Sequence, residues 1–199
     1  MKHRTTFLYI TLSTLSGIIL IFYGKFLSSV QTRPGLQFLD PLFGQWQAHD
    51  FTWPIFILIY STLAVTIVHL LRSRSKELML KFLFAYALMA LVRMAMMSCL
   101  PLDPPAGMIA LSDPLVELFL GQRTSFTRDL FFSGHTATLS LCLLSFSNLR
   151  SRVLIGVATL VMASLMVAQQ AHYTVDLLVA PFVAYGCYRM SCLCMRTIS

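Results

Sequence analysis

The sequence predicts an all-α polytopic membrane protein, folded as a bundle of six transmembrane helices in a single domain that covers residues 1–199. Hydrophobic residues make up 57% of the chain and charged residues only 12%, whereas a soluble domain carries about 25% charged residues. Six apolar segments reach the length of about 20 residues that a helix needs to cross a bilayer. The basic residues stand between these segments, so the net charge of +7 indicates membrane topology and not a nucleic-acid partner.

The six segments are joined by short connections and by two longer ones. The first segment runs on through Tyr23-Gly24-Lys25 and lacks the small-residue cleavage pattern of a secretory signal, so we expect a retained span. The second and third segments flank a basic connection, as do the fourth and fifth, and the sixth follows the fifth almost directly. In chain order the expected spans are residues 7–28, 53–71, 78–100, 130–148, 152–170 and 172–190.

The charge distribution orients this bundle. Ten of the 15 Lys and Arg residues fall on one side of the membrane, which the positive-inside rule assigns to the cytoplasm together with both termini. The other side carries two longer, more acidic loops over about 29–52 and 101–129. The ten basic residues are Lys2, Arg4, Arg72, Arg74, Lys76, Lys81, Arg150, Arg152, Arg189 and Arg196, and the acidic loop residues are Asp40, Asp50, Asp103, Asp113, Glu117 and Asp129.

Two histidines lie near the starts of spans four and six, and both starts face the non-cytoplasmic side. His172 and Asp176 are four residues apart on a predicted helix and therefore share a face. Asp176 can accept the Nδ1 proton of His172, which leaves Nε2 as a nucleophile suited to attack on phosphorus. His135 follows Ser133-Gly134 and can give a proton to a departing alkoxide and take one from an acceptor. A lone histidine at a helix start is more often an interfacial hydrogen-bonding residue, but two with a carboxylate on one side indicate a site.

These segments resemble the sphingomyelin synthase branch of the type 2 phosphatidic acid phosphatase (PAP2) superfamily. That family has Ser-Gly-His-Thr at the start of its fourth span and His-Tyr-Thr-(Val/Ile)-Asp at the start of its sixth, as residues 133–136 and 172–176 do here. Weaker similarities are the upstream Asp129, Arg93 before Leu100-Pro101-Leu102-Asp103-Pro104, and Asp40 within Leu39-Asp40-Pro41. The resemblance covers residues 90–199 well and 1–89 weakly.

The resemblance implies transfer of a phosphorylated head group from a glycerophospholipid donor to a lipid-alcohol acceptor such as ceramide, through a phosphohistidine and without a metal or other cofactor. It implies His172 as the nucleophile, Asp176 as its orienting carboxylate and His135 as the proton-transfer residue. The expected phosphate ligands are Arg93, Ser133, Gly134 and Arg128, and the expected head-group or supporting residues are Asp129, Tyr173 and Asp40.

The chain departs from the classical phosphatase pattern of the superfamily at its basic residues. Lys25 and Arg33-Pro34 are one residue too far apart for Lys-x6-Arg-Pro, and Met166 stands where an Arg precedes the second His. A phosphomonoester is close to a dianion and benefits from several cations, so this deficit favours a phosphodiester substrate. Arg123 and Arg128 in the outer loop can replace the missing cations. Arg128 also stands where the animal enzymes have a Cys, which leaves the head-group selectivity open.

Two other functions remain open on this scaffold. The first is a PAP2-type lipid phosphatase or phospholipase C-like hydrolase, in which water replaces the lipid alcohol. The second is a non-catalytic membrane protein, which predicts that His135, His172 and Asp176 need not converge. For Arg93 the alternative to a phosphate ligand is a snorkelling rim residue that binds bulk lipid phosphate.

Overall fold

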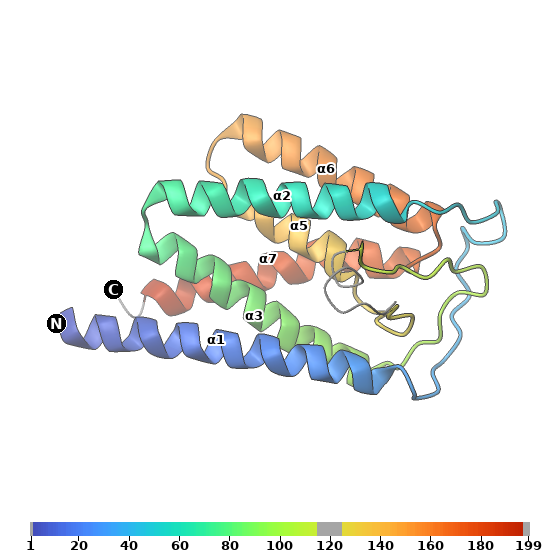
Figure 1. The fold of residues 1–199 in the computed structure, drawn as a ribbon, viewed down its shortest axis with the longest axis horizontal. Helices are drawn as coiled ribbons and strands as arrows, with labels where there is room; N and C mark the ends of the chain where they lie inside the picture. The colour runs from blue at the N-terminus through green and yellow to red at the C-terminus, as the bar shows by residue number, and fades with distance from the viewer. Residues whose placement is uncertain (1, 115–124, 197–199) are drawn as a thin grey trace.

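The computed structural model describes residues 2–114 and 125–196, and this part of the chain is helical apart from loops and isolated bridges. The predicted all-α class is therefore confirmed over the described residues. The helices, drawn in Figure 1, are α1 (Lys2–Val30), α2 (Thr52–Ser73), α3 (Lys76–Cys99), α5 (Gly134–Leu144), α6 (Leu149–Ala168) and α7 (Thr174–Arg196).

Five of these helices, α1, α2, α3, α6 and α7, are long and apolar enough to cross a membrane. The expected fourth span is not matched in full, because α5 has only 11 residues instead of the stretch 130–148. At 1.5 Å per residue it is roughly 16 Å long, about half the hydrocarbon thickness of a bilayer. Six full spans are therefore not confirmed.

The ends of α5 have local causes. Ser133 is its N-cap, with a side chain that accepts a hydrogen bond from the Thr136 amide, and the helix closes at Ser145. Asn148 then caps α6 by accepting from the Ser151 amide. The apolar character of α5 reflects burial inside the bundle, since α5 packs against α2, α3, α6 and α7 and is surrounded by them.

Figure 1 shows that α1 begins and α7 ends at the same end of the bundle. We call this the turn end, because the tight connections α2–α3 and α5–α6 also lie there. The loop end is the opposite end, where residues 31–51, the described parts of 100–133 and residues 169–173 gather. Successive connections between helices thus lie alternately at the loop end and at the turn end, as in a bundle whose helices cross a membrane in turn.

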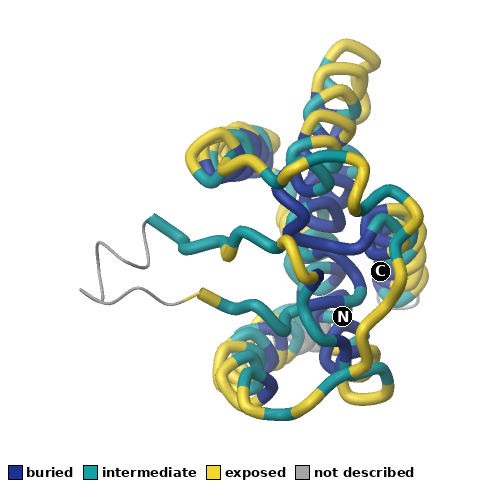
Figure 2. Tube along the Cα trace, turned by 90° about the vertical axis from the view of Figure 1, so that its right-hand side faces the viewer, coloured by how far each residue is buried: buried dark blue, intermediate teal, exposed yellow. Residues whose placement is uncertain are grey.

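Burial runs along the inner faces of the helices, and the outward faces are exposed (Figure 2). Large apolar side chains cover these outward faces, among them Ile21, Phe22, Leu154 and Phe182. Exposed apolar surface on this scale is unfavourable in water and favourable in lipid. The bundle is therefore that of a multi-pass membrane protein.

Candidate active site

A cavity of about 310 Å³ lies among α1, α2, α3 and α5 and extends to residues 171–172. Five residues singled out from the sequence line it together: Arg93, Asp129, Gly134, His135 and His172. They come from α3, the segment before α5, α5 itself and the segment before α7. The fold thus brings both histidines and one guanidinium to a single space.

His172 is held by Asp176, although not in the way the sequence pattern suggested. The histidine precedes α7, which begins at Thr174, so the two residues do not share one helix. Asp176 Oδ2 lies 3.2 Å from His172 Nδ1 and also accepts the Tyr173 amide at 3.2 Å. This reach-back to the residue before the helix resembles a capping box. Because a carboxylate can only accept, Nδ1 carries the hydrogen and Nε2 keeps its lone pair.

His135 is the second residue of α5 and stands edge-on to Phe56, with ring centroids 5.7 Å apart. A backbone hydrogen bond couples its helix to the other motif, since the Ser133 amide donates to the Asp176 carbonyl at 3.2 Å. The starts of α5 and α7 are therefore fixed relative to each other. His172 and Asp176 are almost fully buried, at 4% and 0% exposure.

Arg93 is a buried cation at the wall of the cavity and not a rim residue. Its Nη2 lies 2.9 Å from Asp129 Oδ1 and donates to the Asp129 carbonyl at 2.9 Å. Breaking such a buried pair leaves an uncompensated charge and costs about 3–5 kcal/mol. Burial raises the pKa of the Asp129 carboxyl, and the charge of Arg93 counters this only in part. The Arg93 Nε–H has no partner among the described residues.

Gly134 lets the guanidinium approach the start of α5. A Cβ at this position would stand 1.8 Å from Arg93 Nη1 and 2.8 Å from its Cζ. No L side chain fits there unless Arg93 moves. The glycine of the Ser-Gly-His-Thr motif is thus required by packing against the cation that faces the cavity.

Three residues expected to bind phosphate or head group instead support the scaffold. Ser133 is fully buried and its hydroxyl caps α5. Asp40 accepts hydrogen bonds from both the amide and the hydroxyl of Thr174, the latter at 3.0 Å, and so caps α7. The Tyr173 hydroxyl donates to the Asp103 carbonyl at 2.9 Å. None of the three lines the 310 Å³ cavity, because each side chain is engaged in hydrogen bonds to a loop or a helix start.

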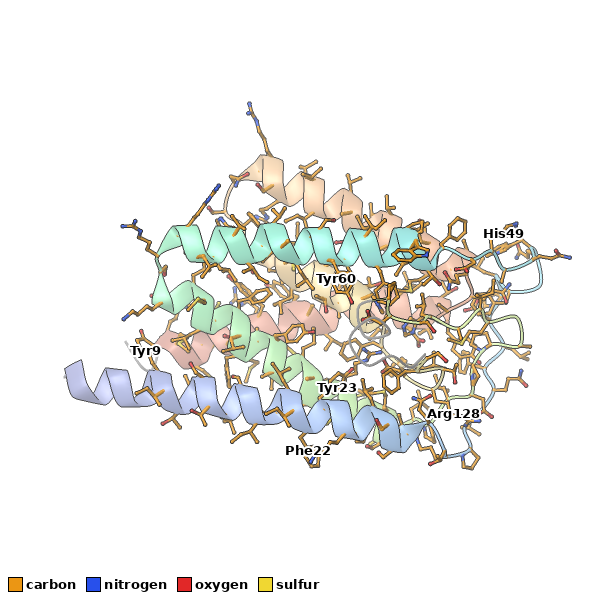
Figure 3. All side chains as sticks on the ribbon, viewed as in Figure 1. Tyr9, Phe22, Tyr23, His49, Tyr60 and Arg128 are labelled. Carbon is orange, nitrogen blue, oxygen red and sulfur yellow. The ribbon has the colours of Figure 1, made fainter. Side chains whose placement is uncertain are left out.

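Arg128, which the sequence suggested as a phosphate ligand, does not line the cavity either. Its guanidinium pairs with Asp103 and donates to the Arg33 carbonyl. Figure 3 places it at the loop end, beside the end of α1. Glu117 and Arg123 lie outside the described residues.

The positions that depart from the phosphatase pattern supply no cation to the cavity. Lys25 is exposed on α1, the Arg33 guanidinium donates to the Met97 carbonyl, and Met166 is fully buried in the core. Arg93 is thus the only Lys or Arg among the described lining residues. No group of three His, Cys, Asp or Glu side chains within the described ranges is arranged to hold a metal ion.

Sequence reasoning missed residues that form the walls of the site. Tyr23 lines the cavity from α1, on the side that faces α3 (Figure 3). Asp113 lines it from the second outer loop and accepts from the Tyr60 hydroxyl at 2.6 Å. The buried Gln169 accepts from the Phe51 amide at 2.8 Å and donates to the Ile109 carbonyl at 3.2 Å, joining two loops three residues before His172. The only sequence signal for Gln169 was its polar side chain at the end of the fifth apolar segment, just before the motif that begins at His172.

Comparison with known families identifies one match. Residues 128–192 match a family model described as PAP2 superfamily C-terminal, which spans α5, α6, most of α7 and both histidine motifs. A search of curated proteins finds no match to this chain. The family match supports the PAP2 superfamily and indicates a membrane protein of the lipid phosphatase or phosphotransferase type. It does not distinguish the branches of the superfamily.

Proposed function

We propose that this PAP2-type membrane protein is a lipid head-group phosphotransferase of the sphingomyelin synthase-like kind. It would move a phosphorylated head group from a glycerophospholipid to a lipid hydroxyl such as that of ceramide, through a phosphohistidine. The observation that carries the proposal is the single cavity shared by His135, Arg93 and a His172 whose Nδ1 is held by Asp176.

In the first step the donor phosphate binds beside Arg93 and the backbone of Gly134. His172 Nε2 attacks phosphorus, and the bond from phosphorus to the diacylglycerol oxygen breaks. Protonated His135 gives its proton to that leaving oxygen, so diacylglycerol departs neutral. The phosphorylated ring of His172 gains positive charge, which the Asp176 carboxylate at Nδ1 stabilises.

In the second step the acceptor lipid hydroxyl gives its proton to His135 and attacks phosphorus. The bond to His172 Nε2 breaks, the new phospholipid forms, and both histidines return to their starting protonation states. The same residue therefore acts as acid and then as base, as reversible transfer requires.

The charge of the cavity supports a phosphodiester substrate over a phosphomonoester. Arg93 supplies one positive charge, and two carboxylates, Asp113 and Asp129, line the same space. A dianionic phosphomonoester would meet one already paired cation, whereas a phosphodiester brings a single negative charge.

The walls of the cavity support a lipid substrate. Much of the remaining lining is apolar and comes from α1, α2 and α3, with Leu27, Phe56, Ile59 and Met89. We place the turn end in the cytoplasm because the basic residues gather there, and the cavity then lies toward the non-cytoplasmic side. Lipid donors and acceptors would reach it from that leaflet.

The alternative is a phosphatase or phospholipase C-like hydrolase, since water can replace the lipid alcohol at the same residues. The decisive experiment uses purified protein in liposomes with labelled phosphatidylcholine, phosphatidylethanolamine or phosphatidic acid, with and without ceramide. A new phospholipid that appears only with ceramide supports transfer. Faster turnover of phosphatidic acid than of any diester, with no capture by ceramide, replaces transfer with the phosphatase. A non-catalytic protein would turn over none of the three lipids.

A further inference from the structure

Two hydroxyl groups in the lining of the cavity that His135 and His172 share have no part in the mechanism proposed above. One belongs to Thr138 on α5 and the other to Tyr86 on α3. Their assignment to a lipid substrate rests on the proposed function. The contacts, burial and position of the two side chains indicate which part of the lipid they bind.

The Thr138 hydroxyl has no hydrogen-bond partner within the described part of the chain, although the residue is only 4% exposed. Buried hydroxyls elsewhere in the bundle donate to the carbonyl four residues back in their own helix, as those of Thr66, Ser140 and Thr159 do at 2.8 Å. The Thr136 oxygen is also unpartnered, but it has almost no accessible surface. Thr138 differs because it lines the cavity, so a group that enters the cavity can reach its hydroxyl.

Both hydroxyl-bearing residues lie deeper in the bundle than the proposed phosphate position. α5 runs inward from the loop end, so Thr138 lies one turn, or about 6 Å, beyond Gly134 on its helix. α3 runs toward the loop end, and Tyr86 lies two turns, or roughly 10 Å, before Arg93 on the same face. A lipid whose phosphate is held by Arg93 and Gly134 therefore extends past Thr138 and Tyr86 on its way to the bilayer centre.

The surroundings of these hydroxyls are apolar. On α3 the lining residues between Tyr86 and Arg93 are Met89 and Ala90. Binding pockets combine a mostly apolar lining with a few polar groups that fix the orientation of the ligand. Each hydroxyl can donate one hydrogen bond. The matching part of the ligand is a neutral acceptor embedded in an apolar molecule, which describes the acyl carbonyl of a lipid.

The proposed donor and acceptor carry such a carbonyl at the same place relative to the reacting oxygen. In a diacyl glycerophospholipid the sn-2 ester is attached to the carbon next to the one that bears the phosphate oxygen. In ceramide the amide is attached to the carbon next to the one that bears the reacting hydroxyl. One carbonyl-binding subsite can therefore hold the departing diacylglycerol and the arriving ceramide in turn.

We propose that Thr138 and Tyr86 form a subsite that donates hydrogen bonds to the acyl carbonyl next to the reacting oxygen of the lipid. The subsite selects lipids by their acyl linkage and is independent of the head group. By holding this carbonyl it also holds the reacting oxygen beside phosphorus, which favours transfer through orientation.

The test compares two phosphatidylcholines that differ only in their carbonyl groups. Full-length protein with His172→Ala, a change that keeps the donor uncleaved, is mixed in a neutral detergent with equal amounts of diacyl and dialkyl phosphatidylcholine of the same chain length. Native mass spectrometry counts each lipid in the complex that retains one lipid, and the wild-type protein is measured alongside. We expect the diacyl lipid in about fivefold excess or more, as one net hydrogen bond would give.

Three variants make the test specific. Thr138→Val removes the hydroxyl at nearly constant shape and should lower the ratio of diacyl to dialkyl lipid by about threefold or more, as should Tyr86→Phe. Thr138→Ser keeps the hydroxyl and should retain most of the preference. Thr159→Val is the matched control, because the Thr159 hydroxyl is bonded to the Ile155 carbonyl within α6, and it should leave the ratio unchanged.

The liposome assay links the subsite to turnover. The wild-type protein should turn over the dialkyl donor more slowly than the diacyl donor, and Thr138→Val should narrow this difference. If no lipid is turned over, the proposed function fails, while the ratio of bound lipids still decides the subsite. The subsite is overturned if the wild-type protein binds both lipids equally, if Thr138→Val keeps the wild-type ratio, or if Thr138→Ser or Thr159→Val lowers the ratio as much as Thr138→Val.

Discussion

Gly134→Ala tests the geometry of the proposed site most sharply, because it adds one methyl group at a known contact. The new Cβ would stand 1.8 Å from Arg93 Nη1, whereas ordinary contact begins near 3.4 Å, so the guanidinium must move by roughly 1.6 Å. That shift lengthens the 2.9 Å contact between Arg93 Nη2 and Asp129 without removing either partner of the pair. Misplacing a group at a reacting centre by about 1 Å can lower the rate about 100-fold.

We therefore expect Gly134→Ala to lower turnover about 100-fold in the liposome assay with labelled phosphatidylcholine. The loss of stability should be only about 1–3 kcal/mol, because the atom displaced is the end of a flexible side chain. Thermal unfolding in detergent measures this second quantity. Gly186→Ala is the matched control, since its added Cβ meets nothing within 4 Å, and it should leave turnover unchanged.

A double variant separates an effect through Arg93 from a general distortion of α5. If Gly134 acts through Arg93, the double variant Arg93→Ala with Gly134→Ala should be no slower than Arg93→Ala alone. Gly134→Ala with wild-type turnover would refute the placement of Arg93 at the substrate. Additive losses in the double variant would refute the coupling.

Three further outcomes follow from the same structure. His172→Ala should abolish a covalent phosphoenzyme. Asp176→Asn should lower turnover about 10³–10⁴-fold without unfolding the protein, because the tautomer of the His172 imidazole is no longer fixed. Wild-type rates in either variant would contradict the assignment. Asp40→Ala should destabilise the protein by about 1–2 kcal/mol in thermal unfolding through loss of the cap on α7, and an unchanged melting temperature would exclude that role. A reporter fused after Ser199 should read cytoplasmic and a cysteine at Gln122 should be labelled from outside, both positions being beyond the described residues; the opposite pattern would invert the bundle.

Hydropathy predicted five of the long helices well because a lipid-facing span must be apolar along its length. It overestimated the length of the fourth helix, because a helix buried inside the bundle is apolar whatever its length, and α5 covers only Gly134–Leu144. The bounds of α5 depend instead on the caps Ser133 and Asn148, which are single polar residues in an apolar stretch. Hydropathy averages over such residues.

The site was predictable where its parts lie close in sequence. His172 and Asp176 are four residues apart and do meet, although the helix begins after the histidine and not at it. The pairing of Arg93 with Asp129 joins residues 36 positions apart, so no local pattern reveals it. Arg128 was assigned to phosphate on charge alone, and its distant partner Asp103 holds it elsewhere.

In the proposed function His172 carries the phosphorylated head group from the donor lipid to the acceptor lipid. The most direct measurement is rapid acid-free quenching of the reconstituted protein with a donor labelled at phosphorus, followed by mapping of the labelled peptide. We expect label on His172 that is lost when ceramide is added and recovered in a new phospholipid. Label on His135, or turnover with no labelled protein at any time, would contradict it.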